Sequence, residues 1–148
     1  MKLELKIEPM SEQDVEKIIA LGGKTPEFNT GTNARQFYGV STLKRWVTDP
    51  NGVTLVARIK DNIVGFALGY YMAGPNDGYL NCIVVNQECR RRGIGKKLLQ
   101  RALSEFKTKG SCNHVFGVVE SDNAQAIDFF RKNSLEIGRE FRYVERMI

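Results

Sequence analysis

The sequence is poor in the residues from which disulfide frameworks and zinc sites are built, since its 148 residues include three cysteines and one histidine. Cys82, Cys89 and Cys112 are odd in number, and no two of them form a C-x-x-C motif. These spacings argue against a disulfide scaffold and against a zinc site. We therefore expect buried or incidental thiols and no metal. His114, the single histidine, follows a polar turn and is expected on the surface.

Long apolar stretches are also missing. No hydrophobic run approaches the length that spans a membrane, and the first residues, MKLE, do not begin a hydrophobic signal core. Hydrophobic residues make up 42% of the chain and charged residues 26%, as is typical of a globular protein. We expect one domain over residues 1–148, located in the cytoplasm and without a membrane partner.

Positive charge is in excess, with a formal net charge of +5 at pH 7. A basic chain can bind nucleic acid, but here aromatic residues are not interleaved with basic ones as base stacking requires. Part of the excess is instead concentrated between Arg90 and Lys97. A ligand that carries phosphates would explain this cluster, and we expect no nucleic-acid partner.

The basic cluster lies within residues 83–99, IVVNQECRRRGIGKKLL. The run of Ile83, Val84 and Val85 predicts a strand, and helical apolar spacing begins soon after it. A glycine turn between a strand and a helix lets free first-turn amides converge on an anion, where the helix dipole is positive. Gly93 and Gly95 lack a Cβ, so they can adopt left-handed dihedrals and let a pyrophosphate approach the main chain closely.

Two common phosphate-binding motifs do not fit this turn. A P-loop requires G-x-x-x-x-G-K-[ST], and the chain offers GKK without the earlier glycine or the hydroxyl. The dinucleotide fingerprint G-x-G-x-x-G has Leu98 in place of its third glycine. Arg90, Gly93 and Gly95 do match R-x-x-G-x-G, and the stretch resembles the acetyl-CoA signature of the GNAT superfamily of N-acetyltransferases. A basic turn that caps a surface helix is the plainer interpretation of the hexapeptide alone.

A second motif lies further along the chain. Residues 123–132, NAQAIDFFRK, are similar to the N-x-x-A-x-x-F-Y-x-K segment of the same superfamily. Two motifs at the expected separation are far more specific than either alone.

The periodicity of the chain agrees with this resemblance. It predicts an α/β (α+β) fold with a central mixed, mostly antiparallel sheet flanked by helices, in the order βααβββαβαββ. Strands are predicted over 3–7, 53–59, 63–71, 79–85 and 115–119, with one or two more over 137–148. Helices are predicted from a cap at Ser11 to Gly22, from a cap at Ser41 to Asp49, over 94–106 and over 124–132.

The resemblance implies acetyl-CoA as cosubstrate, a primary amine as acceptor and no metal. In such a fold the main chain of Ile83, Val84 and Val85 binds the pantetheine arm like an added strand. Asn123 and Phe130 of the second motif would also contact the coenzyme, and Asn123 is expected to cap its helix. The pyrophosphate would be held by the turn that Arg90 opens, through the amides of Arg91, Arg92, Gly93, Ile94, Gly95 and Lys96.

The implied reaction is direct attack of an uncharged amine on the acetyl thioester. It needs a base, a donor for the developing oxyanion and an acid for the thiolate. The resemblance gives the donor role to a backbone amide near Val85. Glu27, in a loop, is a candidate base, and Glu120, at the end of the predicted strand 115–119, is a further candidate. Asn81 stands where relatives often carry a carboxylate and could orient a water.

Phe130 departs from the family pattern, because relatives carry there a tyrosine that protonates the thiolate. Three interpretations stay open. Water suffices, because a thiol with a reference pKa of about 8.5 leaves readily. Alternatively, Tyr143 on the terminal strand replaces the missing tyrosine. In the third, the domain is a non-catalytic acyl-CoA-binding or regulatory module, which is the alternative function.

The acceptor stays open between a peptide N-terminus, a lysine side chain and a small amine. Residues 24–51 and the turn 72–78 are expected to shape its pocket, because such loops vary independently of the scaffold. The terminal strand is a candidate for pairing two copies into a homodimer. Four aromatic residues could line the acceptor site, although at this spacing they are more often core: Phe28, Phe37, Tyr38 and Trp46.

Overall fold

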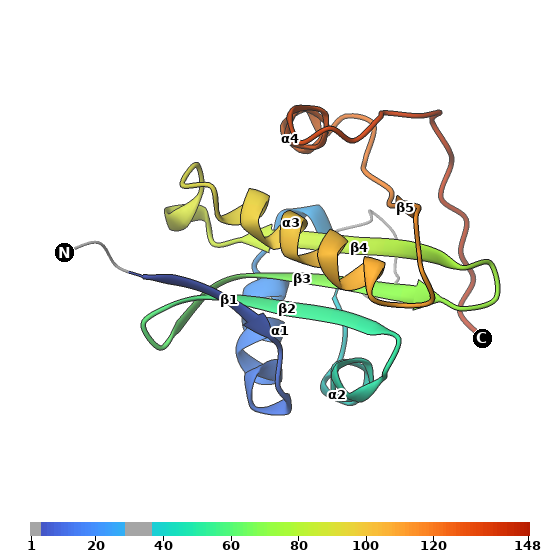
Figure 1. Ribbon diagram of the computed structural model, residues 1–148. Coiled ribbons are helices and arrows are strands. Elements are labelled where there is room, and N and C mark those ends of the chain that lie inside the picture. Colours follow the sequence, from blue (N-terminus) through green and yellow to red (C-terminus); the bar gives the residue numbers. More distant parts are fainter. Residues whose placement is uncertain (1–3, 29–36) are drawn as a thin grey trace. The chain divides into compact units, whose positions relative to one another are not determined.

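The computed structural model describes residues 4–28 and 37–148 (Figure 1). The chain forms two compact units, one ending at Gly117 and one from Val118 to Ile148, and each is described by itself. Leu3 of the first predicted strand and residues 29–36 of the predicted loop lie outside the described residues. The first unit contains, in order, β1 (Leu5–Pro9), α1 (Val15–Gly23), α2 (Val40–Thr48), β2 (Gly52–Ile59), β3 (Asn62–Met72), β4 (Asp77–Val85), α3 (Ile94–Lys107) and β5 (Val115–Phe116).

The five strands form one sheet in the order β1-β2-β3-β4-β5. Strands β1 to β4 are antiparallel to their neighbours, whereas β5 is parallel to β4. The predicted mixed, mostly antiparallel sheet flanked by helices is therefore confirmed. β5 is shorter than the predicted strand 115–119, because its pairing with β4 consists of Gly78–Val115 and Tyr79–Phe116.

Helices α1 and α2 contribute to a hydrophobic core with one face of the sheet (Figure 1). Val15 and Ile18 of α1 and Leu43 of α2 are fully buried in this core, together with Val56 and Phe66 of the sheet. Each such side chain removed from water contributes about 1.5–3 kcal/mol. This core holds α2 against β2 and α1.

Helix α3 covers the other face of the sheet (Figure 1). Its buried side chains are spaced as the sequence predicts for an amphipathic helix, and Phe106 is fully buried. A Cβ built on Gly69 or Gly78 would lie 2.7 or 2.8 Å from the Phe106 ring. These two glycines therefore make room for the ring, which brings the end of α3 close to the sheet.

The first helices begin at caps that the sequence identifies only in part. Ser11 forms a capping box at the short 3₁₀ turn Glu12–Asp14 that leads into α1, in which its N–H donates to Asp14 Oδ2 at 2.9 Å. Its Oγ also donates to this oxygen, at 3.0 Å. The predicted cap of α2 at Ser41 is wrong. The helix begins at Val40, and the cap is Gly39, whose carbonyl accepts from the Leu43 N–H at 3.1 Å. Glycine competes with serine at this position because either residue adopts the extended backbone of a cap.

Arg58 on β2 is held by two carboxylates. Its Nη2 lies 2.5 Å from Asp14 Oδ1, and its Nε lies 3.2 Å from Glu8 Oε2. Burial by itself would raise the pKa of Asp14, but hydrogen bonds from Arg58 and Ser11 outweigh it and leave the pKa below the usual value of 3.8. The ion pair thus ties β1 and the start of α1 to β2.

The second unit contains α4 (Ala124–Lys132), which matches the predicted helix. Asn123 caps it, since its Oδ1 accepts from the Ala126 N–H at 3.0 Å, as predicted. The predicted strands over 137–148 are wrong, because these residues form no strand. Alternating side chains define two faces, but a strand also requires a partner for its backbone hydrogen bonds, and no ladder in the described chain includes this segment. Across residues 4–28 and 37–148, no helix combines the length and apolar character needed to cross a membrane.

Candidate functional site

The connection from β4 to α3 is a tightly folded turn. Arg90 folds back, and its Nε donates to the Val85 carbonyl at 3.0 Å. Arg91 and Gly93 have left-handed backbones, with φ of 61° and 78°. Gly93 thus uses the left-handed backbone that its missing Cβ permits. Gly95 does not, because this residue is the second of α3 and its backbone is helical.

The backbone amides of this turn have no acceptors. From Arg91 to Lys96, no N–H donates to any group in the described part of the chain. The first bond at the start of α3 runs from the Lys97 N–H to the Gly93 carbonyl, at 3.1 Å. A Cβ built on Gly93 would meet no atom within 4 Å, so the turn is open to a ligand. Six successive amides at a helix N-terminus can surround an anion.

The positive charges around the turn are also unpaired. Arg91, Arg92, Lys96 and Lys97 are exposed, and none of them forms an ion pair or side-chain hydrogen bond with the described residues. No carboxylate therefore neutralises the cations beside the free amides. The turn and its cations, residues 90–97, are called the anion turn below.

Strand β4 carries an irregularity before the anion turn. Its register with β3 shifts between Leu68–Cys82 and Gly69–Leu80, so that Asn81 is the extra residue of a β-bulge. Bulges re-aim side chains and often lie near active sites. Beyond Tyr79, no strand of the first unit pairs with the free edge of β4 within the described residues. This half of the edge includes Ile83, Val84 and Val85.

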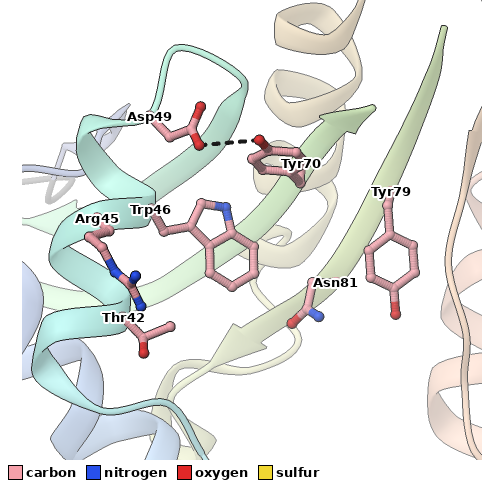
Figure 2. A pocket seen from close by; sticks show the side chains of 7 residues that line it. All are labelled: Thr42, Arg45, Trp46, Asp49, Tyr70, Tyr79 and Asn81. Atoms are coloured by element: carbon pink, nitrogen blue, oxygen red, sulfur yellow. Dashed lines mark hydrogen bonds between the residues drawn. The ribbon is translucent and has the colours of Figure 1, made fainter. Parts of the chain in front are cut away.

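A groove of about 440 Å³ lies between α2 and the strands β3 and β4 (Figure 2). The Trp46 indole lies between the two ends of the groove, and its Nε1 donates to the Gly69 carbonyl at 2.8 Å. On the β4 side, Asn81 Oδ1 accepts from the Tyr38 hydroxyl at 3.1 Å. These hydrogen bonds fix two walls of the groove. Its lining consists of Thr42, Arg45, Trp46, Asp49, Tyr70, Tyr79 and Asn81.

Two charged side chains lie at different places along α2 in this groove (Figure 2). Asp49 Oδ1 accepts from the Asn51 N–H at 2.9 Å, and its Oδ2 accepts from the Tyr70 hydroxyl at 3.2 Å. Arg45 is exposed, and its guanidinium forms no hydrogen bond or ion pair with any described residue. Figure 2 shows Arg45 directed toward Thr42, away from Asp49.

The structure brings together only some of the predicted site residues. Asn81 borders the groove. Glu27 lies in the short turn Pro26–Phe28, and its side chain is not among those that the structure describes. Asn123, Phe130 and Tyr143 belong to the second unit. Phe130 packs against Phe129 in a T-shaped contact at 5.3 Å. Tyr143 is 74% exposed and does not lie on a strand, which corrects its predicted placement.

The aromatic candidates divide between core and groove. Phe28, Phe37 and Tyr38 pack against the core of the first unit, and Phe37 lies 5.9 Å from the Phe66 ring. Trp46 packs against the same core and also lines the groove.

Five residues of the groove were not named individually from the sequence, although three of them lie in the segment 24–51 that was expected to shape the pocket. Thr42, Arg45 and Asp49 share a helical face with Trp46, at spacings of three and four residues that could have revealed them. Tyr70 and Tyr79 are directly opposite each other on β3 and β4. Their pairing depends on the register of the hairpin, which the sequence does not show.

The remaining reactive side chains do not form a second centre. Burial raises the pKa of Cys82 to about 12, so its thiol stays protonated among core side chains. His114 is exposed, as predicted, and its Nδ1 lies 2.7 Å from Asp77 Oδ1. In the part of the chain that is described, no three His, Cys, Asp or Glu side chains gather closely enough to hold a metal ion.

Comparison with known proteins identifies the family. The model of the acetyltransferase (GNAT) family matches residues 24–134. An uncharacterized N-acetyltransferase of Methanocaldococcus jannaschii is 32% identical over 85 residues, which cover 57% of this chain and 53% of that protein. The chain thus spans about half the length of this curated relative.

Solved structures share the fold. An aminoglycoside acetyltransferase from an uncultured soil metagenomic sample, in complex with trehalose, has a TM-score of 0.76 at 24% identity, covering 97% of this chain and 96% of that one. The PaiA N-acetyltransferase of Thermoplasma acidophilum, in complex with coenzyme A, has a TM-score of 0.78 at 20% identity, covering 91% of each chain. Together with the family match over most of its length, this shows that the chain belongs to the GNAT family of acetyltransferases.

Proposed function

We propose that this protein transfers the acetyl group of acetyl-CoA to a primary amine, by direct attack of the uncharged amine on the thioester. The observation that carries the proposal is the anion turn, where the amides from Arg91 to Lys96 and the neighbouring cations have no partner among the described residues. Acetyl-CoA supplies an activated acetyl group, and its pyrophosphate has the charge that this turn lacks.

The free edge of β4 supports the same ligand. An extended pantetheine arm needs unpaired main-chain groups with which to form strand-like hydrogen bonds. Beyond Tyr79, the described part of the first unit offers such an edge, at Ile83, Val84 and Val85. Their side chains are half-buried or buried, so the main chain is the part that would bind the coenzyme.

The transfer forms a C–N bond and breaks a C–S bond, and the amine loses a proton. A backbone amide near Val85 would donate to the carbonyl oxygen as negative charge develops there. The Arg90 hydrogen bond to the Val85 carbonyl holds this end of β4 in place. Preorganised donors of this kind lower the barrier because they need no rearrangement during the reaction.

The amine must lose a proton and the thiolate must gain one. Asn81 cannot accept a proton, but the Tyr38 hydroxyl occupies its Oδ1 and leaves its amide N–H groups to hold a water. Glu27 stays a predicted base. Phe130 has no proton to give to the departing thiolate, so water or Tyr143 would supply it.

The first test is calorimetric titration with acetyl-CoA. Wild type should bind in the micromolar range, about −8 kcal/mol at ~1 μM. Gly95→Trp, which places an indole in the anion turn, should abolish binding in a protein with an unchanged circular dichroism spectrum. Gly23→Trp is the matched control, because a Cβ at Gly23 meets no atom within 4 Å and this residue lies at the end of α1. If Gly95→Trp does not fold, the Arg91→Gln/Arg92→Gln double variant replaces it.

Turnover separates the proposed function from its alternative. Incubation with acetyl-CoA and a panel of amines should release free thiol and yield acetylated amines. Binding without turnover would instead support the non-catalytic acyl-CoA-binding function, particularly if Phe130→Tyr created activity. No binding by folded wild type would contradict both functions.

A further inference from the structure

We propose that the amine acceptor is zwitterionic: it carries an anionic group, such as a carboxylate, that binds Arg45, while Asp49 attracts its ammonium form. This inference rests on the proposed function and names its substrate class. It is argued from the groove between α2, β3 and β4, which has the volume of a small-molecule site.

The first step is the separation of Arg45 from Asp49. They are four residues apart, with Arg45 in the last turn of α2 and Asp49 as its C-cap, a spacing at which opposite charges at a helix can pair. Here no ion pair joins them within 4 Å, because the Asn51 N–H and the Tyr70 hydroxyl hold the carboxylate. The fold thus keeps a positive and a negative group apart within one groove.

Asp49 and Arg45 each lack a partner of opposite charge among the described residues. Neutral donors hold Asp49, and no cation pairs with it in the described part of the chain. Its half-buried carboxylate lies near the Trp46 and Tyr70 rings, and carboxylates and aromatic faces both attract ammonium groups (Figure 2). Arg45 pairs with no anion among the described residues, and its planar guanidinium is suited to binding a carboxylate through two hydrogen bonds.

The charge of Arg45 disfavours polycations as acceptors. A molecule with several ammonium groups would satisfy Asp49 but would meet Arg45 with a like charge. A monoamine that lacks an anionic group would leave Arg45 without a partner. A zwitterion satisfies both charges, and its apolar part would lie along the Trp46 ring between them.

The test uses matched acceptors that differ in one group: 5-aminopentanoate, pentylamine and pentane-1,5-diamine, together with phenylalanine and phenethylamine. We expect kcat/KM to be at least tenfold higher for each amino acid than for its matched amine. Arg45→Gln should remove this preference by raising KM for the amino acids at least tenfold more than for the plain amines. Lys44→Gln is the matched control, because Lys44 is an exposed cation of the same helix that does not line the groove.

Asp49 is tested in the same assay. Asp49→Asn should raise KM for all the amines about equally, whereas Asp61→Asn, in the exposed β2–β3 turn, should not. Acetylation of plain amines or diamines in preference to amino acids would overturn the inference and leave the proposed function intact. So would an amino-acid preference that survives Arg45→Gln.

A binding readout keeps the test decisive if no amine is acetylated. Saturation-transfer NMR with coenzyme A present should detect 5-aminopentanoate on wild type and lose the signal on folded Arg45→Gln. That result would support the zwitterion site while the transferase proposal fails. Absence of binding for both amino acids would overturn the inference.

Discussion

Two groups of arginines in the first unit have opposite surroundings. Arg58 lies between Asp14 and Glu8, and its partly buried guanidinium is bound by both carboxylates. Arg91 and Arg92 are exposed on the anion turn and have no carboxylate partner in the described part of the chain. The same residue type thus stabilises the fold in one place and is available for a ligand in the other.

The difference shows how structural charges can be told from ligand-binding charges. A buried cation must be compensated within the fold, because desolvation of an unpaired charge is costly. An exposed cation without a partner costs little, and several of them beside free amides raise the local affinity for an anion. The predictions below separate stability from binding on this basis.

The largest expected effect on stability is that of removing Arg58. Arg58→Ala would leave Asp14 buried without its partner, so we expect the free energy of unfolding to fall by about 3 kcal/mol. Urea denaturation followed by circular dichroism measures this change. Arg45→Ala, an exposed residue without an ion pair, is the control and should stay within about 0.5 kcal/mol of wild type. Equal effects of both changes would contradict the comparison.

A smaller change is expected for the anion turn, and in binding rather than stability. Arg91→Gln/Arg92→Gln should weaken acetyl-CoA binding by about 30-fold, or ~2 kcal/mol, because two charge-assisted contacts to phosphate are lost. Calorimetry measures the affinity, and thermal unfolding should hardly change. Lys107→Gln, a cation at the opposite end of α3, should bind acetyl-CoA as wild type does. A stability loss as large as that of Arg58→Ala would mean that these arginines are structural.

The stability of the fold in acid should depend on Asp14, the carboxylate that pairs with Arg58. The pKa of Asp14 is lower in the folded than in the unfolded chain, so its ionised form stabilises the fold above the unfolded value near 3.8. This stabilisation is lost as the pH falls through the lower folded pKa. Asp14→Asn should therefore flatten the decline of unfolding free energy in acid, as measured by denaturation between about pH 5 and pH 2. An unchanged slope would show that Asp14 does not titrate in this way.

The smallest expected effect is that of salt, which should weaken binding at Arg91 and Arg92 but not the stabilisation by Arg58. Raising the ionic strength from about 0.05 M to about 0.5 M screens exposed charges far more than buried ones. We expect acetyl-CoA affinity to fall severalfold, while the contribution of Arg58, measured as the difference between wild type and Arg58→Ala, stays nearly constant. Salt-independent binding of acetyl-CoA would argue against a role for Arg91 and Arg92.

Much of the fold could be predicted from the sequence because its signals are local. Apolar spacing gave the helices α1, α3 and α4, and Ser11 and Asn123 were correctly identified as caps, since a cap depends on residues only a few positions away. The terminal strands were not predicted correctly. Alternation over 137–148 describes the segment itself, whereas a strand requires a second segment to pair with it.

The sequence by itself determined the sheet class, the anion turn and the family, because each depends on short motifs in a fixed order. The tertiary structure decided the rest of the site. Which tyrosines face each other depends on the β3–β4 register and its bulge at Asn81. That Asp49 turns to Tyr70 rather than to Arg45 depends on packing between α2 and β3, where hydrogen bonds across the fold outweigh a favourable helical spacing.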